Sequence, residues 1–147
     1  MSWNYSKELE DHFLNPRNYL DEDEDFQYDL KEIIGNRWCG DEMAIYLQFE
    51  KTKEGLTPYR LSDRVIKDVR WQSYGCASAI ANMSMLSEMI KGQTVENALK
   101  ITPDDLVAKL GGVPDQKKHC SLLGCDLLKK AFGKDYNTDL DKVTESN

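Results

Sequence analysis

The sequence predicts a single α+β domain, in which a small three-stranded antiparallel sheet carries helices packed on one of its faces. Two patterns indicate this fold class. Apolar and polar residues alternate between residues 29 and 73, as in strands, and apolar residues recur at helical spacing from residue 77 onward. A helix followed by strands and then by helices is typical of α+β proteins. The 147 residues suffice for one domain with its own core, spanning 1–147.

A short amphipathic helix is predicted over residues 4–14, and it should end at Asn15-Pro16 because proline disfavours helical geometry in the residue before it. The acidic run 21–25 then indicates a solvated loop, with a docking surface for a basic partner as the alternative. Residues 1–3 and 134–147 are expected to be flexible.

Three strands are predicted over 29–35, 42–50 and 64–73, with residues 51–58 forming the turn between the last two. One face of the second strand is apolar and consists of Met43, Ile45, Leu47 and Phe49. In the third strand Lys67 interrupts a similar series, formed by Val65, Val69 and Trp71. Hairpin connections of this kind give an antiparallel meander.

The helical half begins after Cys76 and should contain two longer helices with two short ones between them. The first long helix buries Ala79, Met83, Leu86 and Ile90 and ends at Gly92. Thr94 and Thr102 are predicted N-caps of the short helices, and Gly111-Gly112 closes the second. The last helix is predicted from Lys118 to Phe132, with Leu123, Leu127, Leu128 and Ala131 buried.

Three of the four cysteines lie at junctions between predicted elements. Cys39 falls between the first two strands, Cys76 where the third strand becomes a helix, and Cys120 near the start of the last helix. Helix N-termini favour a thiolate, which is the form that binds metals. Together with Asp41 and His119, these cysteines give five candidate ligands for the four positions of a tetrahedral metal, and such a surplus would permit ligand exchange.

Other potential ligands are expected to be structural. Cys125 lies five residues after Cys120, which is roughly 140° around a helix, so it should face elsewhere and act as a packing or surface thiol. His12 lies on the first predicted helix, away from the cysteines in the sequence. The methionines of the first long helix are expected in the core; they are Met83, Met85 and Met89.

Composition excludes several classes of function. The net charge is −7, which argues against nucleic-acid binding because a phosphate backbone would be repelled. No stretch approaches the roughly 18 apolar residues of a membrane helix, and residues 1–11 have no apolar signal core. We therefore expect a cytoplasmic protein without membrane contact, whose cysteines serve metal or thiol chemistry.

Several segments, in order, resemble the iron–sulfur cluster assembly scaffolds of the IscU/NifU type. The matching segments are Tyr5-Ser6, Asn15-Pro16-Arg17-Asn18, Cys39-Gly40-Asp41, the run YGCASAIA at 74–81, Lys91-Gly92 and His119-Cys120-Ser121. The resemblance implies that a cysteine desulfurase delivers sulfur as a persulfide, chiefly to Cys120. It further implies that iron then binds, that a two-iron, two-sulfur cluster forms, and that this cluster passes to apo iron–sulfur proteins.

The resemblance also assigns ligands. Cys39, Cys76 and Cys120 correspond to cluster ligands, with Asp41 or His119 as the fourth, and the same residues hold zinc in family members that carry no cluster. A chaperone is a further partner in the family, but the segment 113–117 keeps only the first proline and the lysine of the chaperone-binding motif.

Three alternatives to a cluster scaffold remain open. One is a zinc-bound sulfur acceptor of the SufU kind, although His119 occupies a position where that branch usually has a basic residue. Another is a nucleophilic enzyme using Cys120 and His119, in which adjacent residues at a helix start are expected to point apart. The third is a purely structural zinc domain, which would leave the surplus of ligands without a purpose. A scaffold, by contrast, is a carrier rather than a turnover enzyme.

Overall fold

The computed structural model describes residues 5–36, 41–51 and 63–145, and within these it describes no side chain of Asn36, Asp41 or residues 133–145. The sheet consists of β1 (Leu30–Asn36), β2 (Asp41–Phe49) and β3 (Ile66–Tyr74) in the order β1-β2-β3, with both pairs antiparallel. The predicted three-stranded meander is therefore confirmed, whereas the predicted turn 51–58 lies almost entirely outside the described residues.

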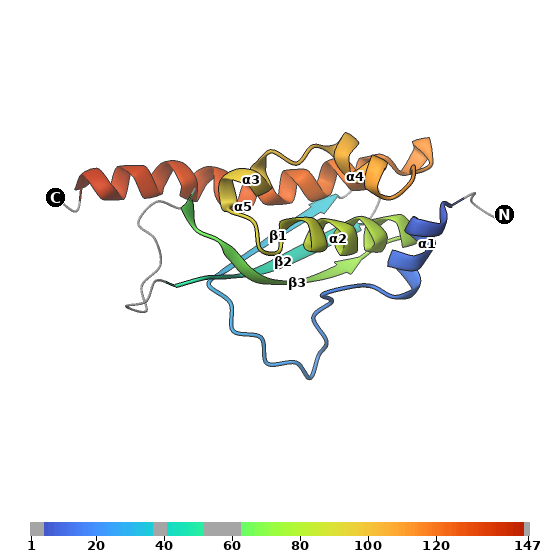
Figure 1. The fold of residues 1–147 in the computed structure, drawn as a ribbon, viewed down its shortest axis with the longest axis horizontal. Coiled ribbons are helices and arrows are strands. Elements are labelled where there is room, and N and C mark those ends of the chain that lie inside the picture. Colours follow the sequence, from blue (N-terminus) through green and yellow to red (C-terminus); the bar gives the residue numbers. More distant parts are fainter. Residues whose placement is uncertain (1–4, 37–40, 52–62, 146–147) are drawn as a thin grey trace.

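Helices cover one face of the sheet (Figure 1). They are α1 (Lys7–Leu14), α2 (Ala77–Ile90), α3 (Val95–Leu99), α4 (Pro103–Lys109), the 3-10 turn η2 (Asp115–Lys117) and α5 (His119–Glu145). The helix α2 packs on β3, and α5 packs on β1 and β2. Side chains of α2 and α5 share one apolar core with the inward face of β2, which confirms the predicted α+β fold. Within the described residues, no helix is both long enough and apolar enough to cross a bilayer.

Side-chain caps define the starts of three helices. Ser6 accepts a hydrogen bond from the Leu9 amide at 3.0 Å, so α1 begins at Lys7 rather than at the predicted residue 4. Thr94 caps α3, and Thr102 forms a reciprocal capping box with Asp105 at the start of α4, as the sequence predicted. Gly111 and Gly112 then follow α4 with φ angles of 71° and 107°, which glycine adopts without strain.

A bulge explains why Lys67 interrupts the apolar series of the third strand. Gln48 pairs with Asp68 but Phe49 pairs with Ile66, so Lys67 is an extra residue without a partner in β2. Because of the bulge, the residues of β3 that face the core change from one alternate set to the other on the two sides of Lys67. Ile66 is therefore fully buried in the core, instead of the predicted Val65. The assignment of Val65 to the inward face was therefore wrong.

The last helix extends beyond its predicted end. It continues through Gly133 to Glu145, whereas the sequence predicted an end at Phe132. A single glycine within a helix costs only about 1 kcal/mol relative to alanine, which is too little to end a helix. Apolar residues at helical spacing continue past it, at Tyr136, Leu140 and Val143. The flexibility expected for residues 1–3 and 134–147 stays a prediction.

The segment between α1 and β1 covers the outer edge of β3 and the second face of the sheet. The Leu20 amide donates to the Trp71 carbonyl at 2.9 Å, which extends the sheet by a parallel bridge. Farther along, Glu24 pairs with Arg70 at 2.8 Å, and the guanidinium of Arg70 lies over the ring of Phe26. The acidic run itself forms a loop in which only Glu24 is partly buried, so the solvated loop is confirmed.

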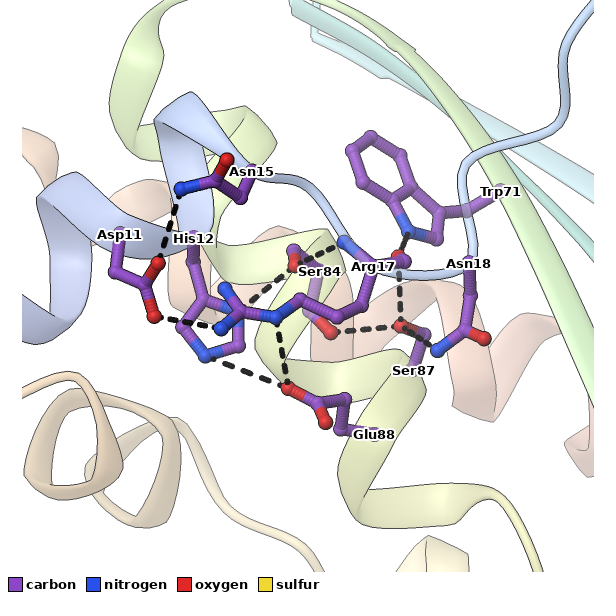
Figure 2. A network of polar contacts seen from close by, with 9 residues as sticks. All are labelled: Asp11, His12, Asn15, Arg17, Asn18, Trp71, Ser84, Ser87 and Glu88. Carbon is purple, nitrogen blue, oxygen red and sulfur yellow. Dashed lines mark hydrogen bonds and ion pairs between the residues drawn. The ribbon is translucent and has the colours of Figure 1, made fainter.

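His12 belongs to a polar network that joins α1, α2 and β3 (Figure 2). Its Nδ1 lies 2.8 Å from the Ser84 hydroxyl, to which the Arg17 amide also donates, and its Nε2 lies 3.5 Å from Glu88. The Trp71 indole donates to the Arg17 carbonyl at 2.6 Å. His12 thus connects elements of the fold, as the structural role predicted for it requires.

Stability should depend on pH through His12. Burial, followed by the nearby Arg17, lowers the pKa of His12 below 6.5, although Glu88 and Asp11 act in the opposite direction. The unfolded chain therefore takes up this proton at a higher pH than the folded chain, and the free energy of unfolding should fall as the pH falls below about 6.5. Urea unfolding at pH 7.5 and pH 5.5 measures the loss.

The matched comparison is His12→Gln, which cannot titrate. This variant should lose less stability between the two pH values than the unmodified protein does. The carboxyl groups with lowered pKa values, Asp11, Asp68 and Asp105, titrate below this window and leave the comparison unaffected. An equal loss in both proteins would contradict the assignment.

Candidate metal centre

Two of the predicted ligand cysteines meet where α2 and α5 begin. Cys76 is the N-cap residue of α2, with extended backbone angles, and Cys120 is the second residue of α5. Their sulfur atoms lie 3.9 Å apart. Each of the two cysteines therefore lies at the positive end of a helix dipole, Cys76 at that of α2 and Cys120 at that of α5.

The sulfur separation fits joint binding of one metal ion. A disulfide would require about 2.05 Å, so the two thiols are not bonded to one another. With a metal–sulfur distance of about 2.3 Å, two sulfurs of a tetrahedral site lie about 3.8 Å apart. The observed 3.9 Å is close to this value, and the pair needs little rearrangement to bind an ion.

His119 lies beside this pair. Its Nε2 is 3.5 Å from the sulfur of Cys120, so the expectation that these adjacent side chains point apart was wrong. Since His119 is the first residue of α5, no earlier turn of that helix crowds its ring. The structure thus places the His119 ring next to the Cys120 sulfur, and its role as a metal ligand or proton carrier stays a prediction.

The other two predicted ligands, Cys39 and Asp41, have side chains outside the described part of the chain. Cys39 lies outside the described residues, and for Asp41 only the backbone is described. The register pairs Asn36 with Asp41 and Glu42 with Tyr74, so the end of β1 at Asn36 and the start of β2 at Asp41 lie at the sheet end next to Cys76. Among the described side chains, no group of three or more His, Cys, Asp or Glu is placed to hold a metal ion. The joint site with Cys39 and Asp41 stays a prediction.

The two sulfur-bearing residues differ in exposure. Cys76 is half-buried, whereas Cys120 is 0% exposed, since the first turn of α5 packs it into the apolar core. An exposed site is expected of a cluster scaffold, because delivery and release of the cluster both require a partner to reach it, and this expectation is wrong for Cys120. Two large apolar side chains next to these cysteines in sequence are well exposed, Tyr74 at 73% and Leu122 at 51%.

A buried hydrogen-bonded chain lies directly behind the two cysteines. The Ser121 hydroxyl donates to Oδ1 of Asn82 at 2.6 Å, and Nδ2 of Asn82 donates to the Ser78 carbonyl at 2.7 Å. All three residues are fully buried. Asn82 was missed in the sequence, although an amide among apolar residues, four positions after Ser78, is a signal of a buried polar contact.

The fourth cysteine belongs to the core. Cys125 is 2% exposed, and burial raises the pKa of its thiol to about 11. It contributes to the same core as Met83, against which Met85 and Met89 also pack. The packing role predicted for Cys125 and for these methionines is confirmed.

Known proteins similar to this chain were found by sequence and by structure. The sequence model of the family described as "NifU-like N terminal domain" matches residues 4–142. The iron–sulfur cluster assembly scaffold protein IscU 1 of Archaeoglobus fulgidus is 44% identical over 96% of this chain and 84% of its own length. The corresponding IscU of Aquifex aeolicus is 39% identical over 100% of this chain and 85% of its own length.

Structural similarity supports the fold. The crystal structure of a NifU-like protein (N-terminal) from Brucella abortus superposes with a TM-score of 0.61 over 86% of this chain and 90% of that chain. The two sequences are only 17% identical, so this likeness concerns the arrangement of helices and strands.

Burial should make Cys125 unreactive in the folded protein. At pH 8, a pKa of about 11 leaves about one Cys125 in a thousand as thiolate, and the surrounding core blocks access to it. Brief treatment with iodoacetamide, followed by peptide mass spectrometry, should label Cys76 and leave Cys125 unlabelled. Denatured protein provides the control, in which both residues react. Equal labelling of both in the folded state would refute the burial of Cys125.

Proposed function

The chain belongs to the NifU-like N terminal domain family, and on this basis we propose that it is a scaffold on which an iron–sulfur cluster is assembled and from which the cluster passes to apo-proteins. The observation that carries the proposal is the pair of sulfurs at 3.9 Å, at the start of two helices. The relatives named as IscU scaffolds match over nearly the whole chain, which supports the same role here.

In the proposed reaction, sulfur arrives from a cysteine desulfurase that carries it as a persulfide. The Cys120 thiolate attacks the outer sulfur, a new sulfur–sulfur bond forms, and the cysteine of the desulfurase leaves as a thiolate. Cys120 is fully buried, so docking of the desulfurase must first open the first turn of α5. His119, whose Nε2 lies 3.5 Å from the Cys120 sulfur, is placed to take up the proton of the Cys120 thiol.

The cluster, proposed to contain two irons and two sulfurs, is cargo and not a resident cofactor. Cys39, Cys76 and Cys120 would hold it, with Asp41 or His119 as the fourth ligand. Thiolates are the ligands that iron–sulfur clusters prefer, whereas a carboxylate is a hard ligand that binds them weakly. Asp41 would therefore be the ligand most readily replaced when the cluster leaves.

A second candidate function is a zinc-bound sulfur acceptor of the SufU kind. The separation of 3.9 Å between the two sulfurs favours this function as much as it favours a cluster scaffold, because the same separation fits two thiolates on one zinc ion. A nucleophilic enzyme is less well supported: its substrate would have to reach the Cys120 sulfur, and Cys120 has no exposed surface. We propose a carrier that hands its cargo on, without turnover.

The proposed partners follow from this role. They are a cysteine desulfurase and apo iron–sulfur proteins, and neither nucleic acid nor a membrane is included. In the segment 113–117, Val113 is buried in a small apolar cluster with Leu9, Ala81 and Leu110. A chaperone that binds this segment as an extended peptide would have to pull Val113 out of that cluster, which, together with the incomplete motif, argues against chaperone recognition of this segment.

Anaerobic reconstitution tests the proposed function. With ferrous iron, cysteine and a desulfurase, the protein should turn brown and gain visible absorbance bands of an iron–sulfur cluster. Serine at position 39, 76 or 120 should abolish or strongly reduce these bands because a thiolate ligand is lost, while Cys125→Ser should leave them intact. Persulfide on Cys120 without colour would instead indicate the zinc-bound acceptor.

Release of the cluster should depend on Asp41. Asp41 is the ligand that a recipient protein would replace most readily when the cluster leaves. Replacing Asp41 with alanine removes this point of exchange, so transfer of the cluster to an apo-ferredoxin should become slower. The transfer rate is followed by circular dichroism of the recipient, with the unmodified scaffold loaded to the same extent. Equal or faster transfer by the variant would show that Asp41 is not the labile ligand.

A further inference from the structure

We propose that Asn82 is a positioning residue for the Cys76–Cys120 pair. Asn82 holds the first turns of α2 and α5 in register, so that both sulfurs can bind the same metal ion. This inference rests on the proposed function, because it concerns the same site. Asn82 contacts neither sulfur in the hydrogen bonds described and would act through the backbone that carries them.

The geometry of the Asn82 amide supports this role. Its acceptor atom binds the hydroxyl of Ser121, the residue directly after Cys120. Its donor group binds the carbonyl of Ser78, two residues after Cys76, and lies 3.4 Å from the Ser78 hydroxyl. One fully buried carboxamide thus connects the two short segments that carry the sulfurs.

Apolar packing alone would not fix this register. The two helices approach closely at Gly124, where an added Cβ atom would lie 3.4 Å from a methyl carbon of Leu86. Such contacts set the distance between helices, but the hydrophobic effect is not directional, and it resists sliding and rotation only weakly. Hydrogen bonds are directional, and buried ones are costly to leave unmade. Asn82 therefore supplies the constraint that the apolar contacts lack.

The consequence concerns metal affinity. Two thiolates held at 3.9 Å bind an ion without first paying the entropy of being brought together. Loss of a group that orients metal ligands typically weakens metal affinity by about 10–100-fold. A loss of that size is expected when the Asn82 amide is removed.

Cobalt binding to the metal-free 147-residue chain tests the proposal, with Co²⁺ as the probe and no sulfur source present. Asn82→Ala should weaken Co²⁺ affinity by about tenfold or more and lower the thiolate-to-cobalt absorbance per bound ion, because one sulfur no longer reaches the ion. Ser121→Ala removes only a hydroxyl and should change both readouts in the same direction. The double variant with both substitutions should lose no more Co²⁺ affinity than Asn82→Ala alone, because both changes break the same chain of hydrogen bonds.

Ser84→Ala is the matched control. Ser84 lies on the same helix and is equally buried, but its hydroxyl contacts His12 and the Arg17 amide instead of α5. The control should lower the melting temperature as the test variants do, yet leave Co²⁺ affinity and the absorbance per ion unchanged.

Two results would overturn the proposal. One is a lowered melting temperature with unchanged Co²⁺ affinity and absorbance in Asn82→Ala and Ser121→Ala, which would reduce Asn82 to a stabilising residue. The other is an equal loss of affinity in Ser84→Ala. If Asn82→Ala does not fold, as judged by circular dichroism, Ser121→Ala decides alone. Failure of the unmodified protein to build a cluster would count against the proposed function only, since the cobalt affinities are measured independently of it.

Discussion

The packing of α2 against α5 on a shared face of the sheet is the interaction on which the rest of this molecule depends. The sheet provides the surface, since the inward residues of β2 and β3 are fully or almost fully buried beneath the two helices. Because both helices begin at the same end of that surface, their first turns meet, and each first turn carries a cysteine. The sulfur pair is therefore a product of the core packing rather than of a local sequence motif.

Polar contacts on two sides of α2 make this arrangement specific. On one side, Ser84 and Glu88 bind the histidine of α1, and on another, Asn82 binds the first turn of α5. The helix is therefore buried almost all around, which explains why it contains several buried polar residues in addition to apolar ones. In a low-dielectric interior such contacts are unfavourable unless every partner is present, so they select one register of the helices over others.

The sequence predicted those features that follow from local patterns. The strands, the caps at Thr94 and Thr102, and the placement of Cys76 and Cys120 at element junctions depend on nearby residues, and the structure confirms them. The bulge at Lys67 depends on how β3 pairs with β2, and the partner of Asn82 lies 39 residues away, so neither can be recognised within one segment. The burial of Cys120 likewise depends on tertiary packing.

That burial has a consequence for the lifetime of the thiol. Oxidation by peroxide proceeds through exposed thiolates, and its later stages are irreversible. A sulfur that has no surface of its own is shielded from such small reagents while no other protein is bound. A docking protein whose binding energy shifts the first turn of α5 would expose this sulfur, so the fold favours access by a partner protein over attack by dissolved oxidants.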